Sequence, residues 1–160
     1  MELKDLLKKI KFAGNIDDCV IENITHDSRK VKPGTLFVAI KGFNDDGHNY
    51  IMDAVDRGAS AVMSNGRTLT NIGVPVIKVD DPRKSMSKIA AVFYQHPTKN
   101  IKITAVTGTN GKTSVTHIIN HIYKTADISC GTLGTLGFST PSGMISTGFT
   151  TPESIDLHQL

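Results

Sequence analysis

The sequence has no tryptophan, only two cysteines and no apolar run long enough to cross a membrane. Cys19 and Cys130 lie far apart and form no CxxC pair, which argues against a disulfide framework and favours a reducing compartment. The first ten residues, MELKDLLKKI, alternate charged residues with leucines, whereas a secretory signal needs an unbroken apolar core. We therefore expect a cytoplasmic protein with no membrane partner.

The sequence also has no strong excess of positive or of negative residues. The chain has 18 Lys and Arg against 15 Asp and Glu, a net charge of +3, and the basic residues are scattered. No basic run resembles a nucleic-acid arm, so we expect no nucleic-acid partner, whereas a small anionic ligand would suit this charge. With 160 residues, 39% of them hydrophobic, the chain is long enough for one domain and part of another.

The first part of the chain, up to about residue 98, predicts a small α/β domain of its own. Leu3, Leu6, Leu7 and Ile10 follow a helical spacing. Asp81 and Pro82 have the residue types of a helix N-cap and first helical position. Runs rich in β-branched and apolar residues predict the strands, which we place at 19–29, 34–40, 59–63 and 74–79.

The pattern restarts after the polar boundary HPTKN. A strand is expected at 101–106, then a glycine turn, then a helix whose apolar face carries Val115, Ile118, Ile119 and Ile122. One further strand is expected within 128–138, and a helix after Pro152. The predicted fold class is α/β: a small amino-terminal α/β domain over 1–98, then the first strand–loop–helix unit of an incomplete second domain over 99–160.

The stretch VTGTNGKTS carries the clearest chemistry. A strand that turns through Gly108 and Gly111 into a helix leaves backbone N–H groups without intrahelical partners, at the positive end of the helix dipole. Phosphate binds well at such a place. Lys112 can reach terminal phosphates, and the hydroxyl of Thr113 is placed to bind a magnesium ion that bridges them.

The match to the usual phosphate loop, G-x-x-x-x-G-K-[ST], is partial because Val106 stands where the first glycine belongs. A plain G-x-x-G turn with an incidental lysine is the competing interpretation. A generic P-loop kinase or GTPase is a weaker alternative, since it leaves the first hundred residues unexplained.

VTGTNGKTS resembles the ATP loop of the Mur ligases and of folylpolyglutamate synthetases, in which the missing first glycine is normal. The folate enzymes carry this loop near their amino terminus, whereas about a hundred residues precede it here. Residues 25–63 resemble the UDP-binding domain shared by two Mur ligases, MurE and MurF, and GTLGT followed by TTPE resembles MurE in particular. The resemblance implies ATP binding by a set of loop residues: Gly108, Thr109, Asn110, Gly111, Lys112, Thr113 and Ser114.

The resemblance also implies a site for the UDP substrate. Ser28 in HDSR matches a serine that contacts the uridine nucleotide, and Phe43, Asn44 and Asp45 match a loop that lines the same pocket. A turn-stabilising serine and a solvated loop are the structural alternatives. The DGH triplet before the helix is better explained as its cap than as catalysis.

Thr150 and Thr151 match a threonine pair that contacts the muramoyl peptide. The residue before this pair is usually asparagine in the family, and here it is Phe149. This departure removes a polar contact from the implied substrate site.

The implied activity is ATP-dependent ligation of a diamino acid to UDP-N-acetylmuramoyl-L-alanyl-D-glutamate through an acyl phosphate, with Lys112 and Thr113 in catalytic roles and Mg²⁺ held by Thr113 and ATP. The family resemblance further implies that much of the second domain and a third domain are missing, so we expect an amino-terminal fragment without activity alone. Three alternatives stay open: a MurF-type ligase, a UDP-sugar-binding module, and a protein that forms homo-oligomers through an exposed sheet edge. The sequence leaves the identity of the diamino acid open.

Overall fold

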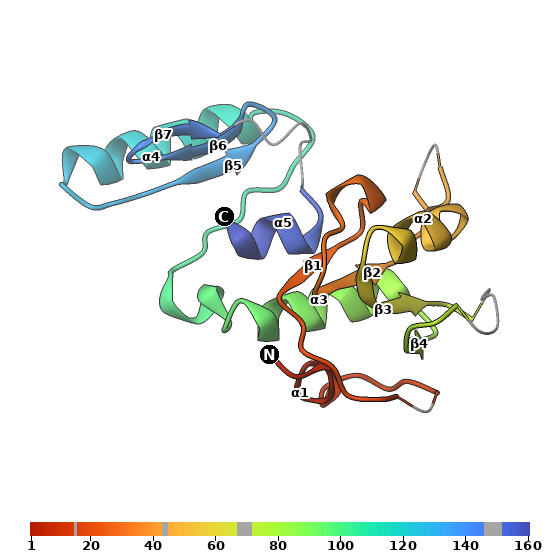
Figure 1. Ribbon diagram of the computed structural model, residues 1–160. Helices are drawn as coiled ribbons and strands as arrows, with labels where there is room; N and C mark the ends of the chain where they lie inside the picture. The colour runs from red at the N-terminus through yellow and green to blue at the C-terminus, as the bar shows by residue number, and fades with distance from the viewer. Residues whose placement is uncertain (15, 43–44, 67–71, 146–151) are drawn as a thin grey trace. The chain divides into compact units, whose positions relative to one another are not determined.

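The computed structural model describes residues 1–14, 16–42, 45–66, 72–145 and 152–160 (Figure 1). The backbone packs as two compact units. One comprises Met1–Pro97 with His158–Leu160, and the other comprises Thr98–Leu157.

The first unit is built on a four-stranded parallel sheet with the strand order β1-β2-β3-β4. Its strands are β1 (Asn23–Thr25), β2 (Thr35–Val38), β3 (Ala59–Ser64) and β4 (Val76–Lys78). All four residues of β2 are buried, as expected for a strand of a parallel sheet that is covered on both faces. The carboxyl ends of the strands meet at one edge, where ligands of open α/β sheets usually bind.

Among its described residues, the unit has three helices, and a side chain caps the start of the last of them. They are α1 (Leu3–Leu7), α2 (Ile51–Asp56) and α3 (Pro82–Phe93), with short 3₁₀ turns at η1 (Ser28–Lys30), η2 (Gly47–Tyr50) and η3 (Pro97–Asn100). In α3 the Asp81 carboxylate accepts a hydrogen bond from the Lys84 N–H at 2.9 Å, and Pro82 takes the first position, as predicted.

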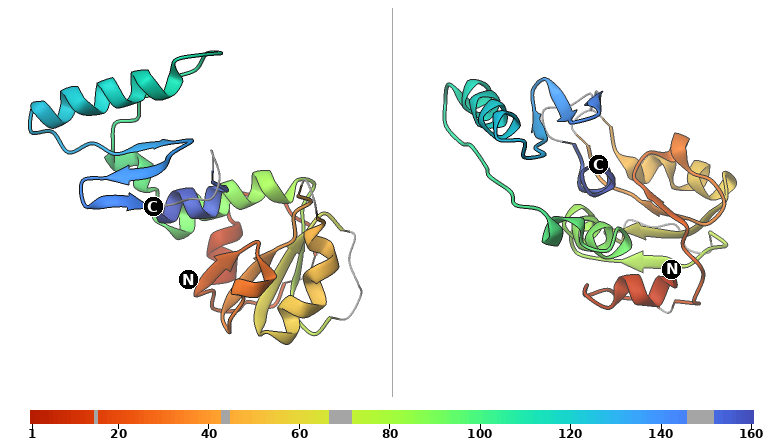
Figure 2. Two further views of the ribbon diagram at one scale, coloured as in Figure 1. Left: turned by 90° about the horizontal axis from the view of Figure 1, so that it is seen from above. Right: turned by 90° about the vertical axis from the view of Figure 1, so that its left-hand side faces the viewer.

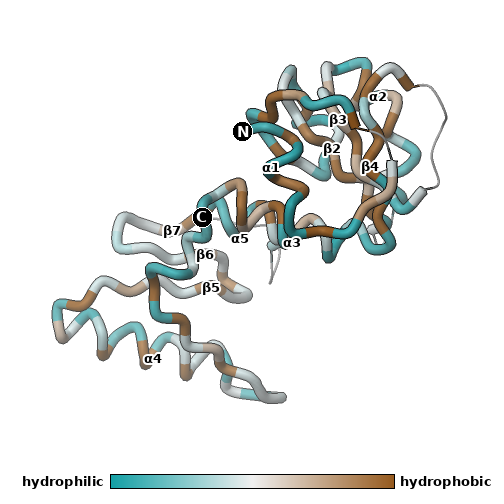
Figure 3. The backbone as a smooth tube through the Cα atoms, turned by 90° about the horizontal axis from the view of Figure 1, so that it is seen from below, coloured by the Kyte–Doolittle hydropathy of each residue, from teal (hydrophilic) through white to brown (hydrophobic). Residues whose placement is uncertain are grey.

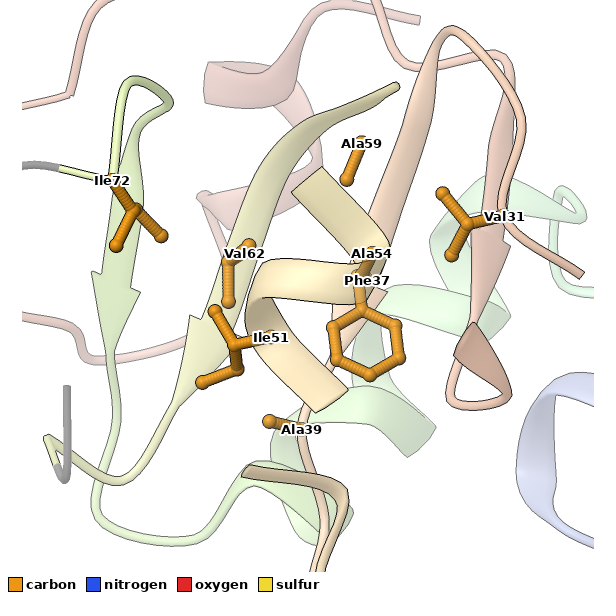
Figure 4. Close-up of a cluster of buried hydrophobic side chains, with 8 residues drawn as sticks. All are labelled: Val31, Phe37, Ala39, Ile51, Ala54, Ala59, Val62 and Ile72. Carbon is orange, nitrogen blue, oxygen red and sulfur yellow. The ribbon is translucent and has the colours of Figure 1, made fainter. Parts of the chain in front are cut away.

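The core lies on both faces of the sheet. Helix α2 contacts β3 on one face, while α3 contacts β2 and α1 on the other (Figure 2). On the α2 face, Phe37 and Val62 pack in one cluster with Ile51 and Ala54 (Figure 4). Because side chains alternate along a strand, Leu36 and Val38 face the opposite way and are also fully buried. The α/β fold class is confirmed.

The second unit has a long helix and a small antiparallel sheet. Helix α4 runs over Lys112–Thr125, and the meander comprises β5 (Thr132–Gly134), β6 (Gly137–Thr140) and β7 (Gly143–Ile145). A last helix, α5, spans Ser154–Gln159.

The strand predicted at 101–106 is wrong, because residues 102–107 have no assigned secondary structure and nearly all are exposed. An extended run becomes a strand only when another strand pairs with it, and the described residues offer it no partner. The single strand expected within 128–138 is instead part of the three-stranded meander, because GTLGTLGF carries a turn between β5 and β6.

The predicted apolar face of α4 is present but uncovered. Val115, Ile118 and Ile122 are 43%, 59% and 60% exposed, and the one buried residue of the helix is Asn120. Figure 3 shows hydrophobic residues recurring along this helix between hydrophilic ones. Among the described residues of this unit, packing therefore contributes little to the stability of α4.

Candidate functional site

The glycine loop opens α4 in the way that the sequence predicts. Gly108 has φ of +145° and Gly111 has φ of +79°, both in the region that favours glycine. Gly111 is the N-cap of α4, and no side chain caps the helix. The N–H groups of the first helical turn therefore point out of the helix without a capping acceptor, which suits a phosphate group.

The two side chains expected to act at this loop lie on the first turn of α4. The Lys112 ammonium donates to the carbonyl oxygens of Gly108 at 2.6 Å and Thr109 at 3.1 Å, so it is folded back over the loop. The Thr113 hydroxyl lies 3.4 Å from that of Thr135, in the turn between β5 and β6. The sequence did not single out Thr135, because a contact across 22 residues leaves no local pattern.

A cavity of about 270 Å³ separates this turn of α4 from the β5–β6 hairpin. Lys112, Thr113, Thr116 and His117 line it from the helix. The Lys112 and Thr113 side chains therefore line an open space at the start of α4, where no side chain caps the N–H groups of the first turn.

The second candidate region is the loop that follows β2. Backbone contacts join residues 40–42 to residues 45–47. The Gly47 N–H donates to the Ile40 carbonyl at 2.9 Å, Lys41 and Asp46 form a bridge, and the Gly42 N–H donates to the Asp45 carbonyl at 2.8 Å. A Cβ atom at Gly47 would lie 2.7 Å from the Ile40 oxygen, so only glycine fits there. The DGH triplet acts as a cap, as expected, since the Asp46 carboxylate accepts from the His48 N–H.

Ser28 lies at the same edge of the sheet, in the turn η1 after β1. It is 8% exposed, and its hydroxyl, together with Arg57, lowers the pKa of Asp53 on α2. Next to it, the Arg29 guanidinium donates to both carboxylate oxygens of Asp27, at 2.9 and 2.8 Å, and lowers the pKa of Asp27. The Ser28 hydroxyl is thus engaged by Asp53, and Ser28 itself lies between the paired Asp27 and Arg29 in the sequence.

Sequence reasoning missed Asp53 and Tyr50. The Asp53–Arg57 pair, at 3.0 Å, has an i, i+4 spacing that could have indicated it. Tyr50 donates its phenolic hydrogen to Asp45 at 2.5 Å, a contact that no periodic pattern reveals.

A larger cavity, of about 630 Å³, opens at the carboxyl ends of β2, β3 and β4. Its lining includes Lys41, His48, Asp80 and Lys84, but neither Ser28 nor Asp45. The expected UDP-binding residues Phe43, Asn44, Thr150 and Thr151 lie outside the described residues, as does Phe149.

The chemistry of the donor set fits a nucleoside triphosphate at the α4 loop better than a resident metal. The uncapped helix start, the Lys112 ammonium and the left-handed Gly111 all suit phosphate oxygens. Among the described ranges of the chain, no three His, Cys, Asp or Glu side chains come together as metal ligands. In the same ranges, no helix has both the length and the apolar character to cross a membrane.

A parallel α/β unit, followed by a second unit in which a glycine loop opens a helix, is typical of nucleotide-binding proteins. The model of the Mur ligase family catalytic domain matches residues 20–94, and the model of the Mur ligase middle domain matches residues 106–160. Together these two models cover most of the sequence. The chain belongs to the Mur ligase family.

Two curated relatives are similar along nearly the whole chain. Both are named UDP-N-acetylmuramoyl-L-alanyl-D-glutamate–2,6-diaminopimelate ligase. The one from Clostridioides difficile is 44% identical over 98% of this chain, and the one from Caldanaerobacter subterraneus is 43% identical over 100%. The chain spans about a third of their length, 33% of each.

Solved structures of MurF ligases share the fold. The structure from Acinetobacter baumannii has a TM-score of 0.58 at 23% identity, covering 84% of this chain and 30% of that one. The structure from Thermotoga maritima in complex with ADP has a TM-score of 0.50 at 28% identity, covering 64% of this chain and 23% of that one.

Proposed function

We propose that this chain provides the UDP-substrate-binding unit and the ATP loop of a MurE-type ligase, with the domains divided near residue 98. The activity is that of peptidoglycan precursor synthesis in the cytoplasm: a diamino acid joins UDP-N-acetylmuramoyl-L-alanyl-D-glutamate at the expense of ATP. The identity of 44% and 43% to two ligases with that printed name supports this subtype. The geometry of the Gly108–Thr113 loop is the observation that carries the proposal.

In this proposal the chain's own residues act mainly as a clamp. The N–H groups at the start of α4 bind phosphate oxygens, and the Lys112 ammonium leaves its carbonyl partners to offset their charge. The Thr113 hydroxyl is a ligand of the Mg²⁺ that accompanies ATP. ATP supplies the phosphoryl group that activates the substrate carboxylate as an acyl phosphate.

Isothermal titration calorimetry with two muramoyl nucleotides tests the proposed subtype. A MurE-type chain is expected to bind UDP-N-acetylmuramoyl-L-alanyl-D-glutamate at least as tightly as the corresponding tripeptide, the product of the reaction. Ser28→Ala should weaken both, on the order of 10-fold, if its hydroxyl helps to hold the nucleotide. A clear preference for the tripeptide would favour the MurF-type alternative, and no binding of either ligand would contradict the proposal.

The 160 residues alone are expected to release no phosphate from ATP above background when the muramoyl dipeptide and a diamino acid are added. The physical reason is that the described residues bring together one lysine and one threonine at the loop but no carboxylate cluster for metal. A coupled phosphate assay on the pure chain measures this. Release that depends on both substrates and disappears in Lys112→Ala would refute the expectation.

Two non-catalytic alternatives remain as proposals of lower rank. The exposed Ile118 and Ile122 on α4 favour a chain that self-associates, and analytical ultracentrifugation over a concentration series would show a rising mass. A binding module would instead bind the uridine ligand and not bind ATP, and Lys112→Ala would leave its affinity for the uridine ligand unchanged.

A further inference from the structure

The Thr113 hydroxyl differs from the hydroxyls of the later threonines on α4. The Thr116 hydroxyl donates to the Thr113 carbonyl at 2.8 Å, and the Thr125 hydroxyl donates to the His121 carbonyl at 2.9 Å, so both protons are used inside the helix. Because Thr113 is the second residue of α4, no helical carbonyl lies one turn before it. In the described part of the chain, the contact of its hydroxyl is instead the Thr135 hydroxyl, at 3.4 Å.

The turn between β5 and β6 holds Thr135 in place. The last pair of residues in this ladder is Gly134 with Gly137, which leaves Thr135 and Leu136 as the two residues of the turn. Gly137 has φ of +103°, in the region that favours glycine. Strand β5 also contacts α4. Since so short a turn has few conformations, the two strands determine where the Thr135 hydroxyl lies.

The two hydroxyls line the same cavity at the start of α4, and both side chains are exposed, so a ligand can approach them from solvent. A threonine that binds a cation through its oxygen still carries a proton, which needs an acceptor on the side away from the cation. The positive ion also makes that proton easier to donate. The 3.4 Å separation exceeds the usual O–H···O distance of about 2.8 Å, so cation binding is expected to draw the two oxygens together.

We propose that Thr135 is a positioning residue for the ATP loop: its oxygen accepts the proton of the Thr113 hydroxyl and so turns the Thr113 oxygen toward the Mg²⁺ that accompanies ATP. This inference rests on the proposed function, in which Thr113 is a ligand of that ion. It adds the turn between β5 and β6 to the nucleotide site, although Thr135 itself acts only through Thr113.

Calorimetric titration of the full chain with ATP, once with Mg²⁺ and once with EDTA, tests this role. Thr135→Val keeps the β-branched shape and removes the hydroxyl, and it is expected to weaken Mg-ATP binding by about three- to tenfold. It should leave the affinity for ATP in EDTA unchanged, because the metal-free nucleotide does not need the Thr113 oxygen as a cation ligand. Thr135→Ser keeps a hydroxyl and should bind Mg-ATP as the wild type does.

Thr125→Val is the matched control, since Thr125 is the last residue of α4 and does not line the cavity. It removes a hydroxyl from the same unit and should leave both titrations unchanged. Thr113→Val should show the same metal-dependent loss as Thr135→Val. The double variant should bind Mg-ATP no more weakly than Thr113→Val, because Thr135 acts through the Thr113 hydroxyl.

Four results would count against the inference. Unchanged Mg-ATP affinity in Thr135→Val would show that its hydroxyl positions nothing, and equal losses with Mg²⁺ and with EDTA would show a purely structural role. Additive losses in the double variant would make Thr135 a direct contact of the ligand. Equal affinity of the wild type for ATP with and without Mg²⁺ would remove Thr113 as an ion ligand, while the ATP loop would stand. Failure of the wild type to bind ATP in either form would instead overturn the proposed function, and this inference with it.

Discussion

Replacing Phe37 by alanine is expected to lower the free energy of unfolding of the first unit by about 3–5 kcal/mol, the usual loss for a large aromatic side chain removed from a core. Phe37 is fully buried on β2, in the cluster that packs α2 against the sheet (Figure 4). Its ring meets Ile51 and Ala54 of α2 on the same face as Val62 of β3. Alanine leaves a cavity that the neighbouring strands cannot fill.

Hydrogen exchange at the amides of β2 and β3 measures this loss separately from any unfolding of the second unit. Phe12→Ala is the control: Phe12 is 43% exposed, so its replacement should change the free energy by no more than about 0.5 kcal/mol. Phe37→Leu should cost less than Phe37→Ala because more of the volume is kept. Equal protection in Phe37→Ala and the wild type would show that this cluster does not hold the sheet and α2 together.

Lys112→Ala is expected to weaken binding of Mg-ATP to the full chain by about 10- to 100-fold, the equivalent of about 1.4–2.8 kcal/mol for lost charge-assisted hydrogen bonds. In the structure the ammonium lies over the loop, bonded to the Gly108 and Thr109 carbonyls, so it is held beside the helix start where phosphate is expected to bind. The same substitution should leave UDP binding unchanged, because Ser28 and Asp45, which are expected to bind the uridine nucleotide, lie in the other unit.

Lys124→Ala is the matched control. Lys124 is on the last turn of the same helix, and its replacement removes the same positive charge. Calorimetric titration of both variants with Mg-ATP, at one salt concentration, separates the two positions from a general effect of net charge. Equal weakening of Mg-ATP binding by Lys112→Ala and Lys124→Ala would show that Lys112 contributes only through net charge and has no specific contact with the phosphates.

Short sequence motifs correctly predicted the features that are set by residues close together in the chain, namely the start of α3 and the glycine turn before α4. Asp81 and Pro82 indicated the start of α3, and the structure confirms both the cap and the position of the proline. The glycines of TGTNGKTS indicated a turn into a helix, and Gly111 has the left-handed conformation at the start of α4. These features follow from hydrogen bonds and backbone angles within a few residues, so a sequence is enough to find them.

Other predictions depended on partners far along the chain. The run at 101–106 has the composition of a strand, but a strand is defined by pairing, and the described residues give it none. Ser28 was singled out by resemblance, whereas its place beside Asp53 follows from the packing of α2 on η1.

The sequence by itself determined the family, the α/β class and the loop with its lysine, because these are encoded in ordered local motifs and in composition. Only the tertiary structure decided that Asp45 is bound by Tyr50, that Thr113 meets Thr135 and that the face of α4 is exposed among the described residues. The physical reason is that side-chain contacts depend on where separate elements are placed in space, and spacing along the chain does not record that placement.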